Sequence, residues 1–262
     1  MREVIKNGMK DTQLEPYARW LIKRSRGIRM PFDLVKNEIY DRQAAEFMGR
    51  VLKKTSNTID IGCHKGQFLE LFLKHAPQGR HFAFEPIPHL ANILHTKFAT
   101  VDVYNLALSN KQGEAAFYLI PDAPALSGLN ARTFIATDKA RQEIVVSTER
   151  LDAVIPPEVK IDLIKIDVEG AEGPVLEGAI ETIQRHKPYI ILEHGGLSSK
   201  EFGFSSGDIY DLLAGQCGLH VSLLKNWLYR GSSLSRRAFV RSRDWYFIAY
   251  PVETQNPTVQ LR

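Results

Sequence analysis

The sequence has few cysteines and no long apolar run, and each of these absences excludes a class of protein. Cys63 and Cys217 are the two cysteines in 262 residues, and they provide neither a disulfide framework nor the ligand spacing of a metal site. No stretch approaches the roughly 18 consecutive apolar residues that cross a bilayer. Residues 1–10 lack the apolar block of a secretory signal. We therefore expect reduced thiols, no membrane span and a cytoplasmic location.

The chain also lacks internal repeats and low-complexity tracts, so a repeat array is not predicted. With 44% hydrophobic and 24% charged residues, it has the composition of a globular protein with an ordinary core. The net charge is +4, and basic residues gather in two clusters, from Arg19 to Arg29 and from Arg230 to Arg243. Such clusters are typical of a solvated surface, or of contacts with anionic headgroups, phosphorylated sugars or nucleic acid.

The spacing of apolar residues divides the chain into an extension and a main domain. Before residue 55 the spacing is helical, with an interruption expected at Pro31. From Asn57 onward, short β-rich runs alternate with helical stretches, as in a parallel sheet built from βαβ units. The sequence therefore predicts a helical N-terminal extension at 1–54, a Rossmann-like α/β domain at 55–252 and a C-terminal tail at 253–262.

Seven strands are predicted for the main sheet. The last two are separated only by a loop, so we expect them to pair antiparallel. The segment 121–139, which contains Pro, Gly, Ser and Asn, is either a lid on the acceptor side or an ordinary surface excursion. The predicted main strands are 58–61, 81–85, 101–106, 162–166, 189–192, 219–224 and 245–250, with extra strands at 114–119 and 143–147 and helices at 67–75, 89–97, 172–185 and 207–214.

A loop with two glycines follows the first predicted strand. Gly62 and Gly66 stand between that strand and a helix, where a nucleotide-binding loop needs glycine for a tight turn and for close approach to the ligand. The spacing is D-x-G-x-x-x-G from Asp60, and not G-x-G-x-x-G. An anionic pyrophosphate would be repelled by Asp60, whereas the ammonium and sulfonium of S-adenosylmethionine would be attracted. Alternatively, Asp60 caps the turn.

A second carboxylate stands at the end of the second predicted strand. Glu85 follows the first strand at the distance at which an acidic residue can accept hydrogen bonds from both ribose hydroxyls. Its alternative role is a solvated strand end. Together with the glycine loop, Glu85 favours S-adenosylmethionine as the cofactor over a nicotinamide dinucleotide, and so disfavours an oxidoreductase.

Over residues 57–195 the chain resembles the FkbM family of S-adenosylmethionine-dependent methyltransferases in six ordered segments: IDIGCHKGQF, FAFEPIPHLANIL, YNLALSN, ERLD, LIKIDVEGAEGPVLEGA and YIILEHG. The resemblance implies a class I methyltransferase fold with a mostly parallel seven-stranded sheet and an antiparallel terminal strand. It places Asp60, Gly62 and Gly66 beside the methionine part of the cofactor, Glu85 on the ribose, and Asn105 and Ala107 beside the adenine. Cys63 and His64 stand where the family usually has Ala-Asn.

Four polar residues are expected at the carboxyl ends of the fourth and fifth main strands: Asp167, Glu169, Glu193 and His194. A protonated alcohol is a poor nucleophile, so a base, or a metal that acidifies the hydroxyl, is needed. Asp167, Glu193 and His194 are the predicted catalytic residues, with His194 or Asp167 as the base. By analogy, the same three could hold a divalent metal, which is not the favoured version. Asp167 and Glu169 could instead cap the next helix.

From the resemblance we expect O-methylation of a hydroxyl on a sugar, glycolipid or secondary metabolite, with S-adenosylmethionine as the methyl donor. One alternative is a catalytically inactive binding protein of the same fold, which the unusual Cys63-His64 pair keeps open. Another is a nucleic-acid methyltransferase, suggested by the Arg230 to Arg243 cluster, although the sequence has neither an Asn-Pro-Pro-Tyr motif for base flipping nor an RNA-binding module. The expected partner is a small molecule or glycan, with peripheral membrane contact possible.

Overall fold

The computed structural model describes residues 32–121, 127–129, 142–195 and 199–252, with side chains of the first helix described from residue 38. The chain divides into two units, Met1–Val51 and Leu52–Arg262. In the first unit, helix α3 (Phe32–Val51) carries two ion pairs between residues four apart, Glu38–Arg42 and Glu46–Arg50. Residues 1–31 of the predicted N-terminal extension, which include the Arg19 to Arg29 cluster, and the tail at 253–262 lie outside the described residues.

The second unit is built on a seven-stranded sheet in the order β3-β2-β1-β7-β8-β10-β9. All neighbouring pairs are parallel except those made by β10, which runs antiparallel to both β8 and β9. The predicted fold class and the antiparallel terminal strand are therefore confirmed. The strands are β1 (Thr58–Ile61), β2 (His81–Phe84), β3 (Val101–Tyr104), β7 (Leu163–Ile166), β8 (Tyr189–Glu193), β9 (Leu219–Leu223) and β10 (Tyr246–Pro251).

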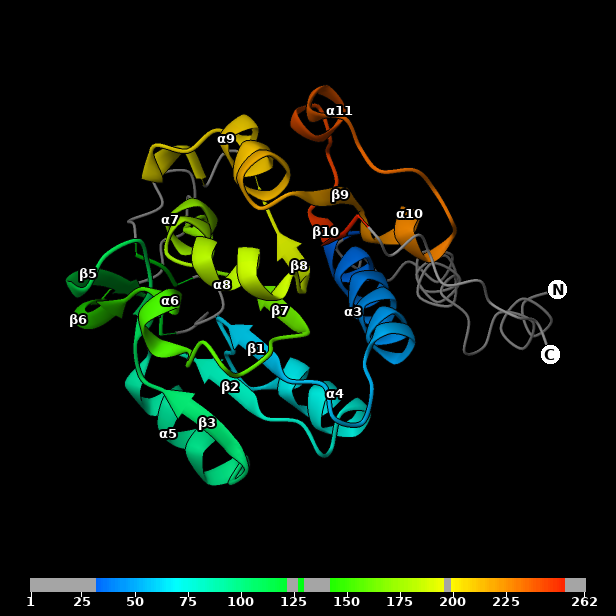
Figure 1. Cartoon of the computed structure of the whole chain (residues 1–262). Helices are drawn as coiled ribbons and strands as arrows, with labels where there is room; N and C mark the ends of the chain where they lie inside the picture. The colour runs from blue at the N-terminus through cyan, green and yellow to red at the C-terminus, as the bar shows by residue number, and fades with distance from the viewer. Residues whose placement is uncertain (1–31, 122–126, 130–141, 196–198, 253–262) are drawn as a thin grey trace, which may run out of the picture. The chain divides into compact units, whose positions relative to one another are not determined.

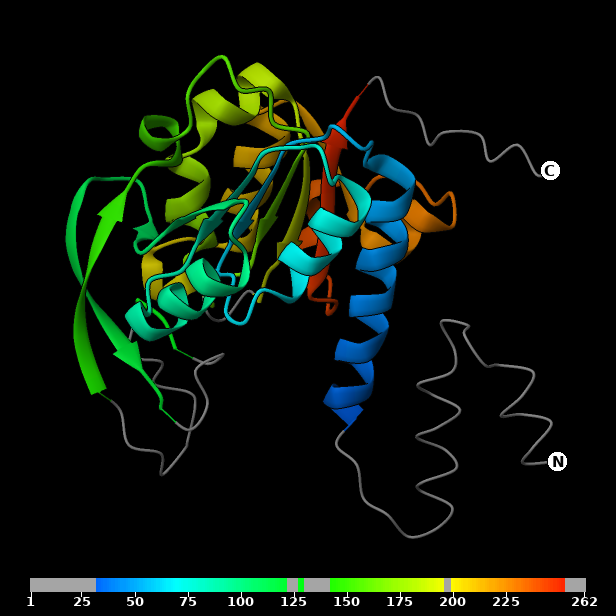
Figure 2. The same ribbon diagram turned by 90° about the horizontal axis from the view of Figure 1, so that it is seen from below.

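The central strands are buried on both faces because helices cover both sides of the sheet. Figures 1 and 2 show α4 (Gln67–His75) and α5 (Pro88–Lys97) on one face, and α7 (Glu172–Glu177) and α8 (Ile180–His186) on the other. β1 and β7 each carry one charged residue, and their other residues are apolar except Thr58. The parallel register places these two, Asp60 and Lys165, on neighbouring positions of adjacent strands.

Two predicted helices differ from the structure. The helix predicted at 172–185 is divided into α7 and α8 at Gly178, where a Cβ would lie 2.0 Å from the carbonyl oxygen of Ser109, an approach that only glycine permits. The helix predicted at 207–214 is α9 (Ser206–Tyr210) followed by a π-helical segment (Asp211–Gln216). Short helices that were not predicted are α6 (Leu151–Val154), η2 (Ser199–Phe202), α10 (Leu224–Leu228) and α11 (Arg236–Val240).

A second, three-stranded sheet has the order β4-β6-β5, with β4 (Ala107–Leu108), β5 (Gly113–Leu119) and β6 (Gln142–Glu149). The strand predicted at 101–106 therefore stops at Tyr104, and the chain then enters the second sheet at Ala107, the first residue of β4. Figure 2 shows the β5–β6 ribbon beyond the edge of the main sheet. Most of the predicted lid segment 121–139 lies outside the described residues; within it, Gly128 bridges to Tyr118.

Among the helices in the described ranges, none combines the length and the apolar character that a bilayer crossing requires.

Candidate functional site

The two glycines of the first loop are required by its geometry. Gly62 has φ +78°, and a Cβ there would lie 1.9 Å from the carbonyl oxygen of Asp167, so the loops after β1 and β7 touch through their backbones. Gly66 has φ +77°, and a Cβ there would lie 2.4 Å from the ring of Phe98. Glycine alone combines this left-handed backbone with such close contacts.

Gly62→Ala is expected to destabilise the protein more than Gly203→Ala. Gly203 has almost the same φ, +79°, but a Cβ there would meet nothing within 4 Å. Gly203→Ala should therefore show only the cost of a left-handed alanine, about 1–2 kcal/mol. Gly62→Ala adds the overlap with Asp167, for a total of about 3–5 kcal/mol. Urea unfolding of the two variants measures the difference, and equal losses would contradict the close approach.

Lys165 is the residue of the site that was not recognised from the sequence. Its amino group donates to the carbonyl oxygen of Gly62 at 2.7 Å and forms ion pairs with Asp60 at 3.3 Å and Asp167 at 3.4 Å. It also lies 5.1 Å from the ring centroid of Phe68. Lys165 thus connects the glycine loop to the loop after β7. The sequence feature that could have revealed this role is a single charged residue in each of two buried strands, Asp60 in β1 and Lys165 in β7.

The Asp60–Lys165 ion pair is almost fully enclosed, with side-chain exposures of 0% and 5%. Burial raises the pKa of Asp60, and Lys165 lowers it in part. Burial lowers the pKa of Lys165, but the carboxylates of Asp167 and Asp60 reverse this effect and leave it above its ordinary value. The direct charge partner of Asp60 is therefore Lys165. Neither carboxylate oxygen of Asp60 accepts a hydrogen bond from the backbone of the described residues, so the turn-capping alternative is wrong.

Glu85 is buried and holds the glycine loop. Its Oε2 accepts a hydrogen bond from the backbone N–H of His64 at 2.8 Å, and its Oε1 accepts one from Ile87 at 2.9 Å. Burial raises the pKa of Glu85 to about 7, against the effect of these two hydrogen bonds. A carboxylate has about four lone-pair sites. Each oxygen of Glu85 therefore retains capacity for a further donor.

The predicted adenine-side residues lie in different surroundings. The side-chain amide of Asn105 donates to the carbonyl oxygens of Glu85 and Pro86 at 2.9 and 3.0 Å, and so ties the end of β3 to the end of β2. Ala107 lies in β4 and packs in a small apolar cluster with Ile87. Asn105 therefore stabilises the end of β2, which carries Glu85, and Ala107 packs in the apolar cluster that contains Ile87.

The unusual Cys63-His64 pair is compatible with the loop. The Cys63 thiol is buried and donates to the carbonyl oxygen of Asp60 at 3.1 Å, and burial raises its pKa well above the ordinary value, so it is an inert packing residue. His64 has φ +49°, and its backbone N–H donates to Glu85. Its Nε2 is covered and makes no hydrogen bond to the described residues. This orphaned polar atom lies in the predicted cofactor loop.

An acidic face is formed where β7 and β8 end. Asp167, with a side chain that is 28% exposed, and Glu169 both act on Glu193. Burial, and then repulsion by Asp167 and Glu169, raises the pKa of Glu193 to about 8, against a hydrogen bond from its cross-strand neighbour Tyr246. The structure thus brings the three predicted acidic residues together.

A further acid, Glu172, acts at the start of the next helix, α7. Helix α7 has no side-chain cap at its N-cap, Ala171. The backbone N–H of Gly170 instead donates to the carboxylate of Glu172 at 2.7 Å. Capping of α7 by Asp167 and Glu169 stays a prediction.

His194 does not join the acidic face. It is buried, with Nδ1 3.3 Å from Oε2 of Glu172 and Nε2 2.9 Å from the hydroxyl of Ser206, and its ring stacks on Phe239. Both ring nitrogens are thus engaged inside the protein, and the structure does not support His194 as a base facing a substrate. The proposed Asp167–Glu193–His194 cation set is not assembled for the same reason. Within the described ranges, no group of three or more His, Cys, Asp or Glu side chains has a metal-holding arrangement.

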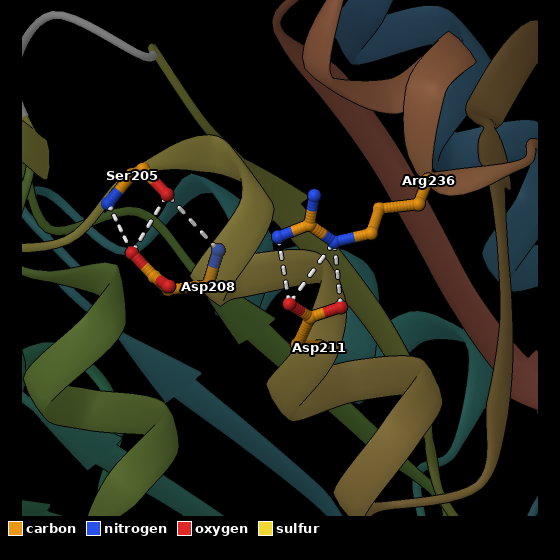
Figure 3. A network of polar contacts seen from close by, with 4 residues as sticks. All are labelled: Ser205, Asp208, Asp211 and Arg236. Carbon is orange, nitrogen blue, oxygen red and sulfur yellow. Dashed lines mark hydrogen bonds and ion pairs between the residues drawn. The ribbon is translucent and has the colours of Figure 1, made fainter.

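Arg236 of the late basic cluster contacts a neighbouring helix. Its Nε lies 2.8 and 3.0 Å from the two carboxylate oxygens of Asp211, and its Nη2 lies 2.8 Å from Oδ2 (Figure 3). The hydrogen bonds from Arg236 lower the pKa of Asp211. Arg236 therefore joins α11 to the segment after α9, while Arg237, Arg241 and Arg243 are exposed.

Comparison with known proteins identifies relatives. The model of the Methyltransferase FkbM domain matches residues 60–230. The 2-O-methyltransferase NoeI of Sinorhizobium fredii is 28% identical over 175 residues, which cover 59% of this chain and 70% of NoeI. The AMB antimetabolite synthetase AmbE of Pseudomonas aeruginosa is 26% identical over 239 residues, or 76% of this chain, but the chain spans only 11% of its length.

Among solved structures, the methyltransferase FkbM from Methylobacillus flagellatus aligns with a TM-score of 0.47 at 16% identity, over 76% of this chain. This chain spans 44% of that protein. A TehB-like SAM-dependent methyltransferase from Corynebacterium glutamicum aligns with a TM-score of 0.44 at 12% identity, over 91% of this chain and 97% of that one. Because the family model covers more than half of the 262 residues, this chain belongs to the FkbM methyltransferase domain family.

Proposed function

We propose that this chain transfers a methyl group from S-adenosylmethionine to a hydroxyl oxygen of a sugar, glycolipid or secondary metabolite. The observation that carries the proposal is the placement of two groups on one edge of the main sheet. The glycine loop, bonded to Glu85, follows β1, and the acidic face of Asp167, Glu169 and Glu193 is formed where β7 and β8 end. Family membership supports methyl transfer, and the name of NoeI supports an oxygen acceptor.

The residues around the glycine loop fit this cofactor. The cofactor supplies an electrophilic methyl group on a sulfonium. Glu85 would accept hydrogen bonds from the ribose hydroxyls with its remaining lone pairs. The backbone from Gly62 to Gly66 would contact the methionine part, and the unpartnered Nε2 of His64 would gain a polar partner there. Lys165, which contacts the loop from β7, is already paired with the carboxylates of Asp60 and Asp167 and so needs no phosphate as a partner.

Glu193 is the base that the structure favours, in place of His194. A carboxylate with a pKa of about 8 accepts a proton from the acceptor hydroxyl oxygen more readily than one of ordinary pKa. Asp167 and Glu169 raise this pKa and so keep Glu193 basic. The remaining rate enhancement comes from holding the hydroxyl oxygen in line with the transferred methyl group.

The test is a transfer assay with methyl-labelled S-adenosylmethionine and a panel of mono- and oligosaccharides, followed by mass spectrometry of the products. We expect S-adenosylhomocysteine together with an oxygen-methylated sugar. Glu193→Gln should keep cofactor binding and lose most of the transfer. RNA is offered to the enzyme in a parallel assay, and labelling of RNA without labelling of any sugar would support the nucleic-acid alternative. Absence of transfer to every acceptor offered would support the inactive binding protein.

The pH dependence separates the roles of the two carboxylates. At saturating cofactor, kcat should fall about tenfold per pH unit below the pKa of Glu193, which is about 8, because only the deprotonated carboxylate accepts a proton. Above that pH, kcat should level off. Cofactor affinity should instead weaken below about pH 7, where Glu85 becomes protonated. A kcat that does not change between about pH 6 and about pH 9 would contradict Glu193 as the base.

A further inference from the structure

A chain of buried hydrogen bonds leads away from the acidic face into the protein. Oε2 of Glu172 accepts from the hydroxyl of Ser199 at 2.7 Å and lies 3.3 Å from Nδ1 of His194. The Ser199 hydroxyl oxygen also lies 3.2 Å from this Nδ1. On the other side of the ring, Nε2 of His194 lies 2.9 Å from the hydroxyl of Ser206. Glu172, Ser199, His194 and Ser206 thus form one network, which we call the His194 network.

The donors and acceptors of this network determine the tautomer of His194. The single hydroxyl proton of Ser199 is given to Glu172, so Ser199 can only accept at Nδ1. The carboxylate of Glu172 can also only accept. A proton must therefore reside on Nδ1, while Nε2 and the hydroxyl of Ser206, each of which can donate or accept, form the hydrogen bond on the other side of the ring.

The other end of the network supports an unusual turn. Oε1 of Glu172 accepts the backbone N–H of Gly170, which has φ +109°. The preceding residue, Glu169, has φ +57° although it carries a side chain. A left-handed non-glycine residue is unfavourable and persists only where its surroundings hold it. The same turn follows Asp167, so its shape sets how the acids Asp167 and Glu169 face Glu193.

Packing fixes the position of the network. The ring of His194 stacks on Phe239, with centroids 5.7 Å apart. At Gly173 a Cβ would lie 2.3 Å from the ring of Phe204, so the segment before α9 packs closely on α7. Figure 3 shows the capping box between Ser205 and Asp208 that sets the start of α9, directly before Ser206.

We propose that Glu172 and His194 are positioning residues for methyl transfer, which hold the Glu169–Gly170 turn and join it to η2 and α9. This role rests on the proposed function, because the turn is important only if its acids serve the acceptor. The cofactor loop is held separately, by Glu85 and Lys165. Loss of the His194 network should therefore reduce kcat and leave cofactor affinity unchanged.

The first test is the tautomer of His194, which needs no acceptor. Nitrogen NMR of histidine rings should show a proton on Nδ1 of His194, whose signal is identified by its loss in His194→Gln. His81 is a matched internal control, because its Nε2 lies 2.9 Å from the carbonyl oxygen of Ala76 and its Nδ1 lies 2.8 Å from the hydroxyl of Thr58. His81 should therefore be protonated at Nε2. A neutral His194 ring that carries its proton on Nε2 alone overturns the network.

The second test is Glu172→Gln, which keeps an oxygen for Gly170 but replaces the acceptor of Ser199 and His194 with an amide donor. We expect kcat to fall at least about tenfold, the affinity for S-adenosylmethionine to stay within about twofold, and the Nδ1-protonated signal to disappear. Unchanged kcat, or weakened cofactor binding of similar size, overturns the positioning role. If the predicted tautomer is found but wild type methylates no sugar, the proposed function fails and the network stands.

A milder variant covers the case in which Glu172→Gln does not fold. Ser206 is partly exposed, and Ser206→Ala removes only the outer hydroxyl of the network. It should lower kcat several-fold without changing the affinity for S-adenosylmethionine. Ser205→Ala is the control at the neighbouring position, where the hydroxyl caps α9 and does not contact His194. Equal effects on kcat of the two serine variants would show that only the stability of α9 matters, and would overturn the positioning role.

Discussion

Lys165→Met is expected to lower the free energy of unfolding by about 3–5 kcal/mol, because it leaves the carboxylate of Asp60 buried without its cation. The ion pair is nearly inaccessible to water, and the lysine also donates to the backbone of Gly62. Its loss should therefore also disorder the glycine loop and abolish binding of S-adenosylmethionine. Urea unfolding and a cofactor titration measure the two effects.

The size of this loss should depend on pH. In the wild type, burial raises the pKa of Asp60 and Lys165 lowers it in part. Without Lys165, the pKa of Asp60 therefore rises further above its ordinary value. A carboxyl group whose pKa is higher in the folded than in the unfolded chain destabilises the fold once the pH rises above its unfolded-state pKa, about 3.9. The difference between Lys165→Met and wild type should therefore be larger at neutral pH than near pH 4.

Lys97→Met is the matched control. Lys97 also forms an ion pair, with Glu70 at 2.6 Å, and also lies over an aromatic ring, that of Phe98 at 4.9 Å. Its side chain is 44% exposed, so water screens the pair and its loss should cost at most about 1 kcal/mol. The double variant Asp60→Asn with Lys165→Met should recover part of the stability. Similar losses for Lys97→Met and Lys165→Met would contradict the importance of burial.

Patterns along the chain predicted the main sheet well, because strand periodicity and the alternation with helices are local properties. The antiparallel pairing of the last two strands was predicted from the loop expected between them, and the pairing is confirmed although the short helices α10 and α11 lie in that segment. The division of the helix predicted at 172–185 could not be predicted. The break lies at Gly178, which closely approaches Ser109, a residue far from it in sequence.

For the candidate site, residue type and position at a strand end predicted which groups gather at the edge, but not which way they point. The sequence places His194 directly after Glu193, yet their side chains serve different parts of the molecule. Glu193 faces Asp167, and His194 turns toward Glu172 and Ser206. This choice depends on partners from η2 and α9, whose positions are set by tertiary packing.

The role of Lys165 illustrates the same limit. A lysine within an apolar strand is unusual, but its role follows only from the register that aligns β7 with β1 and places Asp60 beside it. The electrostatic argument that Asp60 attracts the cofactor directly is therefore incomplete. Its charge acts first on Lys165, and Lys165 in turn holds Gly62.

Glu85→Ala is expected to weaken the binding of S-adenosylmethionine by at least about a hundredfold, because two hydrogen bonds to a charged acceptor are lost. The substitution also removes the acceptor for the backbone N–H of His64, so the glycine loop loses its tie to β2. Glu149→Ala is the matched control. Glu149 also ends a strand and accepts a backbone N–H, from Arg150 at 2.9 Å, but it belongs to the second sheet.

Calorimetric titration of S-adenosylmethionine into wild type, Glu149→Ala and Glu85→Ala at about pH 8, where Glu85 is deprotonated, tests the central claim most directly. We predict one-to-one binding with the same affinity for wild type and Glu149→Ala, and no measurable binding for Glu85→Ala. Wild type that does not bind, or a Glu85→Ala variant that binds as tightly as wild type, would contradict the assignment of this edge as the cofactor site.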